Sequence, residues 1–435
     1  MTIRKTIKDS SFLRDSFTLL SGNLWAQLIA FLAYIFLTRL FSPEDMGIYT
    51  VFYSFIDVLI IISTCKYELA IVLADNDREA SAISRHSLRL NTIISIVLVP
   101  LILVLHYAGK STRMPQLSFF ALQLPIALLI PVMVFFCGTS RVYSQIFNRF
   151  RKFGQIALSE VTGSTSGIIF KILFGLPHLA STFWHTIGLS LGTVLGKIVS
   201  NINLRLHLRK FYLPKDITRA DRRSAADKFR NFPRYTMPKD LVNSLSYNLP
   251  FIWLAMYFDK GEVGLFSLAL TFTFRPTNIL NNVFEKLFYV RVAEKVREGE
   301  SIRRDIFRFA KALNIIALPV FVIGFIFADS IFGFVFGGRW SSCGYYIRCL
   351  LPWIYIMLTS TSLMFLSNVF SKQRTEFIFY IVLFVLRIVA VLAGILTASF
   401  QTGILLFSIS GAIISLALLV WYIGLIRNYE NRETL

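Results

Sequence analysis

Positive charge in this chain alternates between the gaps that separate its long apolar stretches. Twelve stretches are long enough, at about 17–25 residues, to cross a bilayer as a helix. They lie at residues 17–40, 47–65, 88–107, 118–140, 156–176, 183–204, 241–258, 264–289, 311–336, 345–369, 377–397 and 404–426. Lysine and arginine gather in every second gap and are scarce in the others. The sequence therefore predicts an all-α polytopic membrane protein with 12 transmembrane helices.

The same charge pattern predicts how the helices are oriented. Of the 45 Lys and Arg residues, the gaps in which these residues are scarce contain only Arg39, Lys110, Arg113, Lys260 and Arg339. Because loops rich in Lys and Arg stay in the cytoplasm, both termini are predicted to be cytoplasmic. The net charge of +20 then reflects topology and contact with anionic membrane lipid, and no nucleic-acid partner is expected. The first apolar run is too long for a cleavable signal peptide, so it is predicted to remain as a span.

An internal repeat divides the predicted helices into two sets of six. Residues 44–55 (EDMGIYTVFYSF) match residues 261–272 (GEVGLFSLALTF) at a shift of almost half the chain. Each copy follows a long apolar span and opens the next one. We expect two six-helix lobes related by an internal repeat, with an axis along the membrane normal. The predicted parts are an N-terminal lobe at 1–204, a basic cytoplasmic linker at 205–240 and a C-terminal lobe at 241–435.

Several predicted spans carry polar side chains at helical spacing, which places them on one helix face. In the eighth span these are Thr271, Arg275, Asn278, Asn282 and Glu285. Other spans contribute Asn23, Gln27, Asp57, Tyr247 and Asn248. A charge at bilayer depth costs about 2.5–3.5 kcal/mol, so it has to face protein or water. Cations that face a wet interior suit an anion, and a guanidinium suits phosphate in particular.

Pairing between helices explains some of these charges equally well. Glu160 in the fifth span would form an ion pair with a lysine of the sixth span. Arg348 and Arg387 are single charges in the tenth and eleventh spans, and each would either pair or extend toward the membrane surface. The sequence leaves open which buried charges contact a ligand and which contact each other.

The most specific local signature lies around the second span. Residues 37–55 read LTRLFSPEDMGIYTVFYSF, and residues 66–77 read KYELAIVLADND. This pattern resembles the polysaccharide transporter branch of the multidrug/oligosaccharidyl-lipid/polysaccharide exporter (MOP) superfamily, which contains bacterial flippases for O-antigen and related surface glycans. That family usually has an aromatic residue in place of Met46 and often an arginine in place of Lys66, which are mild departures.

The resemblance implies a fold in which spans 1, 2, 7 and 8 line a central cavity. It implies a flippase of the bacterial inner membrane that moves an undecaprenyl-pyrophosphate-linked oligosaccharide to the periplasmic leaflet by alternating access, for surface polysaccharides such as lipopolysaccharide O-antigen. The candidate substrate-binding residues are Arg275, Asn278, Asn282, Arg39, Lys66, Asn23, Gln27, Tyr247 and Asn248. The candidates for coupling to a proton or another cation are Asp57, Glu68 and Glu285. A glycan polymerase is a candidate partner, and no cofactor or metal is expected.

Simpler roles remain open for the residues near the second span. Arg39 and Lys66 would also fit interfacial positions, where a long basic side chain reaches the membrane surface. Asp57 would also fit a hydrogen bond between helices, and Glu68 would fit a surface pair with Lys66.

Two other functional classes compete with the flippase. A drug efflux pump of the same superfamily would favour carboxylates and aromatic side chains in its cavity, whereas this chain offers more buried cations than acids. A membrane glycan polymerase or glycosyltransferase would need catalytic groups on a large loop, but the outward loops are short and no HExxH, P-loop or nucleophile elbow is present. The sequence therefore favours a transporter that is not an enzyme.

Overall fold

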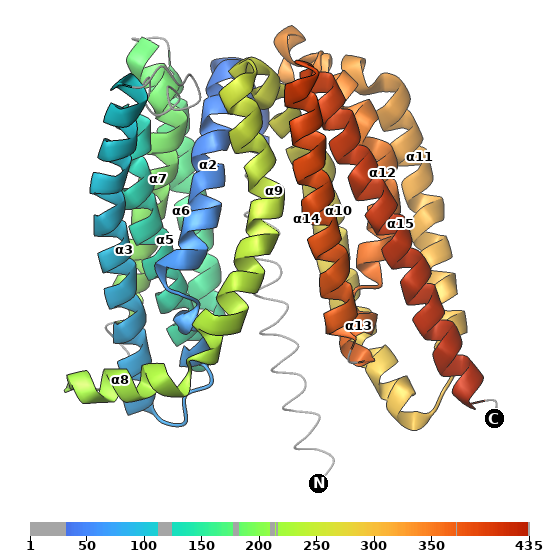
Figure 1. Cartoon of the computed structure of the whole chain (residues 1–435), viewed down its shortest axis with the longest axis horizontal. Coiled ribbons are helices and arrows are strands. Elements are labelled where there is room, and N and C mark those ends of the chain that lie inside the picture. The colour runs from blue at the N-terminus through green and yellow to red at the C-terminus, as the bar shows by residue number, and fades with distance from the viewer. Residues whose placement is uncertain are drawn as a thin grey trace. The chain divides into compact units, whose positions relative to one another are not determined.

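The computed structural model describes residues 32–111, 124–176, 182–208, 214, 216–370 and 372–433, and this part of the chain contains helices and no strand. Residues 32–40 are helical. The other helices are α2 (Pro43–Ser63), α3 (Asp77–Ser111), α5 (Leu124–Arg149), α6 (Phe153–Gly175), α7 (Thr182–Leu208), α8 (Arg219–Lys228), α9 (Met237–Tyr257), α10 (Lys260–Glu298), α11 (Arg303–Phe336), α12 (Cys343–Ser362), α13 (Phe365–Val369), α14 (Gln373–Leu396) and α15 (Phe400–Glu433) (Figure 1). The predicted all-α fold class is confirmed.

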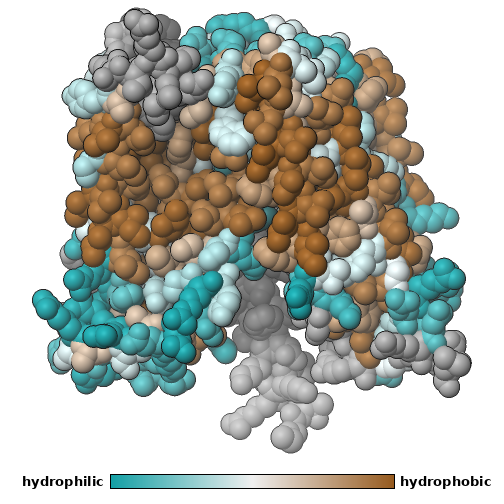
Figure 2. Space-filling model, in the orientation of Figure 1, coloured by the Kyte–Doolittle hydropathy of each residue, from teal (hydrophilic) through white to brown (hydrophobic). Residues whose placement is uncertain are grey.

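Most of these helices have the length and composition of membrane spans. Within the described ranges, nine are long and apolar enough to cross a bilayer: α2, α3, α5, α6, α7, α11, the helix from α12 to Ser367, α14 and α15. Polar side chains such as Asn243 and Asn248 lower the mean hydropathy of α9, and several charges do so in α10. On the face that Figure 2 shows, hydrophobic side chains cover the middle of the helices and hydrophilic residues lie toward their ends.

The chain divides into two compact units that meet between Asn248 and Leu249, within α9. We call them unit 1 and unit 2. The two repeat copies begin equivalent helices. Ser42 and Asp45 form a capping box at the start of α2, and Asp259 accepts hydrogen bonds from the first amides of α10. The predicted lobe boundaries at 204 and 241 stay a prediction.

The core of unit 1 is built around α2. Ile48, Phe52 and Ile56 project from α2 at intervals of four residues and are almost completely buried. They pack with residues of α3, α5 and α7, such as Ile130 and Val194. An apolar stripe at this spacing forms one continuous face of a helix, and its burial fixes the rotation of α2 in the unit.

Helices α6 and α7 approach more closely than larger side chains would allow. Gly163 and Gly167 on α6 face Gly192 and Gly196 on α7. A Cβ atom at Gly196 would lie 2.6 Å from the carbonyl oxygen of Gly163 and 2.6 Å from the Cα atom of Gly167. Small residues at four-residue spacing are typical of tightly packed membrane helix pairs.

The segment after α7 folds onto one end of unit 1. Helix α8 lies across the ends of the longer helices (Figure 1), and its Ala225 and Ala226 are buried against a cluster that includes Tyr67 and Ile83. Ion pairs surround this contact: Arg78–Asp221 at 3.0 Å, Lys228–Asp75 at 2.7 Å and Lys228–Glu79 at 2.6 Å. The part of residues 205–240 that is described is therefore attached to unit 1.

Unit 2 buries an arginine among aromatic rings. Arg387 of α14 is 1% exposed, and its guanidinium carbon lies 4.6 Å from the ring centroid of Phe407 and 5.3 Å from that of Trp353. These cation–π contacts offset part of the cost of burying the charge. Arg387 does not extend to the surface, and Arg348 pairs with Asp329 of α11. Helix α11 itself exposes many apolar side chains, as expected of a helix that faces lipid.

Candidate functional site

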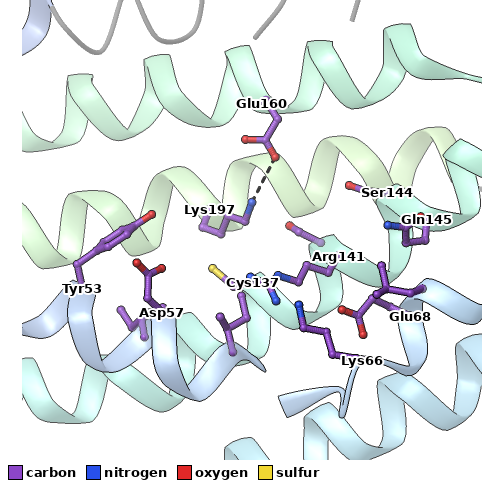
Figure 3. Close-up of a pocket in the computed structure, with 14 residues that line it drawn as sticks. Tyr53, Asp57, Lys66, Glu68, Cys137, Arg141, Ser144, Gln145, Glu160 and Lys197 are labelled. Carbon is purple, nitrogen blue, oxygen red and sulfur yellow. Dashed lines mark ion pairs between the residues drawn. The ribbon is translucent and has the colours of Figure 1, made fainter. Parts of the chain in front are cut away.

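A charged cavity of about 390 Å³ lies within unit 1, among side chains of α2, α5, α6 and α7 and of the turn that follows α2 (Figure 3). Its lining contains three cations and three carboxylates together with small polar and apolar residues. The lining residues are Tyr53, Ile56, Asp57, Ile60, Lys66, Glu68, Leu69, Cys137, Ser140, Arg141, Ser144, Gln145, Glu160 and Lys197. This is the candidate site, because it gathers ionisable groups inside a bundle of membrane-crossing helices.

The turn after α2 places two of the charged residues. Cys65 and Lys66 both adopt the left-handed conformation, with φ of 50° and 62°. For a residue with a side chain this conformation costs about 1–2 kcal/mol, so the surrounding packing has to hold it. The turn leads into a short 3₁₀-helix, Tyr67–Ile71, in which Glu68 is 2% exposed. Lys66 and Glu68 are thereby both directed into the cavity.

Helix α5 supplies a polar stripe to the same cavity. Cys137, Arg141, Ser144 and Gln145 are spaced by three or four residues and share one helix face. The helix continues to Arg149, whose guanidinium donates to the carbonyl oxygen of Ala74 at 2.7 Å and pairs with Asp77. These contacts tie the end of α5 to the connection between α2 and α3, and so fix the stripe beside the Lys66 turn.

Two of the three cations in the cavity have carboxylate partners. Lys197 of α7 lies 3.5 Å from Glu160 of α6, which is the pairing between the fifth and sixth spans that the sequence allowed (Figure 3). Lys66 pairs at 2.8 Å with Asp240 of α9. Asp240 is not one of the residues that line the cavity. The surface pair of Lys66 with Glu68, which the sequence allowed, does not form.

The remaining charges of the cavity are not matched in this way. Arg141 forms no ion pair with a carboxylate in the described part of the chain, although it attracts that of Asp57 electrostatically. The Oε2 atom of Glu68 is buried without a hydrogen-bond partner among the described residues. A buried polar atom without a partner is costly, and Arg141 is partly buried, so a bound group that donates to Glu68 or accepts from Arg141 would lower the free energy of the cavity.

The structure brings together some of the residues predicted from the sequence and not others. Lys66, Asp57 and Glu68 line the cavity. Arg39 is exposed in the helix at 32–40, and Tyr247 and Asn248 lie on α9 outside the lining. The side chains of Arg275, Asn278, Asn282 and Glu285, and the whole of Asn23 and Gln27, lie outside the described residues.

Sequence reasoning missed Arg141. The fourth span was predicted to end at residue 140, where the hydropathy falls, and Arg141 was therefore assigned to a loop. The available signal was the recurrence of polar residues at 137, 141, 144 and 145, which keeps helical spacing beyond the end of the apolar run.

Comparison with known proteins gives the family and the fold. The sequence profile of a family described as "Polysaccharide biosynthesis protein" matches residues 36–344. No curated protein matches the sequence significantly. Among solved structures, the lipid II flippase MurJ in an inward closed conformation aligns with a TM-score of 0.69 at 13% identity, covering 94% of this chain and 90% of MurJ.

Other solved transporters share the same fold. An inward-facing multidrug resistance MATE family transporter of the MOP superfamily aligns with a TM-score of 0.67 at 14% identity, covering 93% of this chain and 96% of that one. A MOP superfamily transporter from Pyrococcus furiosus, described as having a binding pocket of reverse polarity, aligns with a TM-score of 0.52 at 14% identity and 96% coverage of both chains. The chain belongs to this family of polysaccharide biosynthesis proteins and has the fold of the MOP transporters.

Proposed function

We propose that the protein is a flippase that moves an undecaprenyl-pyrophosphate-linked oligosaccharide from the cytoplasmic to the periplasmic leaflet of a bacterial inner membrane by alternating access. Its product would serve the synthesis of a surface polysaccharide such as O-antigen. Both termini would be cytoplasmic, as the distribution of Lys and Arg favours.

The observation that carries this proposal is the charged cavity of unit 1. It occurs in a chain that belongs to a family of polysaccharide biosynthesis proteins. Moving a bare phosphate group through hydrocarbon would cost tens of kcal/mol. A cavity with Lys66, Arg141 and Lys197 among its lining offers the diphosphate head group a polar path in which cations replace water. The polyprenyl tail has no such barrier and would stay in the bilayer while the head group crosses.

The proposal assigns the predicted residues as follows. Lys66 and Arg141 contact the anionic head group in the cavity of unit 1. Arg275, from the polar stripe of the eighth predicted span, is a further candidate for a diphosphate contact. Asn278, Asn282, Arg39, Asn23, Gln27, Tyr247 and Asn248 are further candidates for sugar or diphosphate contacts. Asp57, Glu68 and Glu285 are candidates for cation coupling. Asp57 and Glu68 fit that role because they lie in the same cavity as the anion-binding groups.

A strain that lacks the protein tests the proposal against its two rivals. We expect lipid-linked repeat units to accumulate on the cytoplasmic side and the surface glycan to be lost. Normal glycan together with altered drug tolerance would instead identify an efflux pump. Repeat units that reach the periplasm but stay unpolymerised would identify a polymerase. Restoration of the glycan by the wild-type gene is the control.

A further inference from the structure

Lys66 belongs to the cavity, but its carboxylate partner does not. The ammonium nitrogen of Lys66 lies 2.8 Å from Oδ2 of Asp240, in the first turn of α9, and the two side chains are 13% and 29% exposed. The cavity contains two acids without an ion pair in the described part of the chain, Asp57 and Glu68, yet Lys66 pairs with Asp240 of α9 instead.

The backbone is organised to hold Lys66 in this position. Two consecutive non-glycine residues, Cys65 and Lys66, adopt positive φ at the end of α2. Such residues are uncommon, and a strained turn that persists marks a place where the surrounding contacts determine the conformation. The pair with Asp240 is one of those contacts.

Asp240 has a second cation available if Lys66 leaves it. Oδ1 of Asp240 lies 3.8 Å from the ammonium nitrogen of Lys239, which is itself 61% exposed. Transfer of Lys66 to another anion would therefore not leave the Asp240 carboxylate without a counter-charge. The cost of breaking the pair is correspondingly low, in the range of partly exposed ion pairs.

One turn further along, α9 is attached to α2 a second time. The hydroxyl of Ser244 donates to the backbone carbonyl of Asp57 at 3.2 Å. The first turns of α9 are thus held to unit 1 by these two polar contacts and by Met237 and Leu241, which pack against its core. Among these contacts only the Lys66–Asp240 pair involves charge.

We propose that the Lys66–Asp240 ion pair is a latch that the anionic head group opens: an anion that enters the cavity takes Lys66 from Asp240 and thereby frees the first turn of α9. Asp240 acts as a positioning residue, which holds the Lys66 ammonium in place and competes with the anion for it. This inference rests on the proposed function, since it takes a diphosphate as the anion.

The test measures binding of geranyl diphosphate, a soluble probe of the head group, to purified protein at fixed salt. Four variants are compared with the wild type: Asp240→Asn, Lys66→Gln, the double variant, and Asp227→Asn as a matched control. Asp227 is exposed on α8, so its variant makes the same change in net charge away from the cavity lining. Asparagine is isosteric with aspartate, and Asp240 is partly exposed, so the variant is expected to fold.

We expect Asp240→Asn to bind the probe roughly two- to five-fold more tightly than Asp227→Asn, because the competing carboxylate is gone. The gain should vanish in the Lys66→Gln background. Hydrogen exchange of residues 237–244 gives a second readout. The probe should accelerate it in the wild type, and it should already be fast without the probe in Asp240→Asn. The charge-swapped variant Lys66→Asp/Asp240→Lys should restore slow exchange.

The outcomes separate the latch from the function. Equal affinities of Asp240→Asn and Asp227→Asn, or a gain that persists without Lys66, would overturn the latch while leaving diphosphate transport standing. The latch would also be overturned if neither the probe nor the Asp240→Asn substitution changed the rate of hydrogen exchange of residues 237–244. Absence of probe binding in the wild type and in every variant would overturn both proposals.

Discussion

Replacing Gly196 by alanine should destabilise unit 1 by a predictable amount. The new methyl carbon would lie 2.6 Å from the carbonyl oxygen of Gly163, 2.6 Å from the Cα atom of Gly167 and 2.9 Å from its nitrogen. All three are backbone atoms of α6, so no side-chain rotation relieves the contact. Because carbon contacts are optimal at about 3.5–4.0 Å, α6 and α7 have to separate locally by about 1 Å.

Such a separation forfeits a quarter to a half of the dispersion energy of each contact it lengthens. Overpacking of this kind costs about 1–3 kcal/mol, and the higher helix propensity of alanine returns about 0.5–1 kcal/mol. We therefore expect a net loss of about 1–2 kcal/mol, which corresponds to a melting temperature lower by about 2–8 °C.

Thermal melting of the detergent-solubilised protein, followed by tryptophan fluorescence, measures this loss. Gly154→Ala is the matched control, because a Cβ atom at Gly154, in the first turn of α6, meets nothing within 4 Å. The control should melt at the wild-type temperature or slightly above it. Equal melting temperatures for the two variants would refute the close approach of α6 and α7.

Three further predictions address the site and the docked segment. Arg141→Ala should reduce glycan export about ten-fold or more without lowering the protein level. Arg141→Lys should restore export only in part, because an ammonium group lacks the two parallel donors of a guanidinium. Full export by Arg141→Ala, at a protein level that an immunoblot shows to equal the wild type, would remove Arg141 from the mechanism. Arg275→Ala and Arg275→Lys should follow the same order in the same export assay, and an active Arg275→Ala would exclude that residue. Hydrogen bonds from Thr218 and the nearby Arg78 guanidinium lower the pKa of Asp221 to about 2. The stabilisation of the docked α8 should therefore be present above pH 4 and be lost between about pH 4 and 2. Hydrogen exchange of residues 219–228 measures this loss, and a pH dependence of exchange that is unchanged in Asp221→Asn would contradict it.

Hydropathy predicted where helices lie better than where they end. The eighth span was predicted at 264–289, whereas α10 extends from Lys260 to Glu298. Hydropathy reports which residues prefer hydrocarbon, but a helix ends where its backbone hydrogen bonds end, which depends on caps such as Asp259 and Gly299. The same limitation hid Arg141, which follows the apolar run of α5 but remains in its helix.

The candidate site was predictable only in part, for a related reason. Lys66 and Glu68 belong to the motif at residues 66–77, and Asp57 is a single charge within the preceding span, so local sequence features identified all three. The partner of Lys66 is Asp240, which is 174 positions away in a segment read as a linker. A contact between residues so distant depends on how α9 packs beside α2, and a single sequence contains no direct signal of that packing.

The docking of α8 has a mechanical consequence for the chain that follows it. A flexible connector would let the start of α9 move over a distance set by the length of the connector. Here ion pairs and the buried Ala225 and Ala226 fasten the preceding residues to unit 1, so α9 starts from a fixed pivot. A change in the direction of α9 would then have to arise by bending within the helix or immediately before it. The described residues offer two places for such bending: the π-helical turn Phe232–Thr236 that leads into α9, and Pro250 within it.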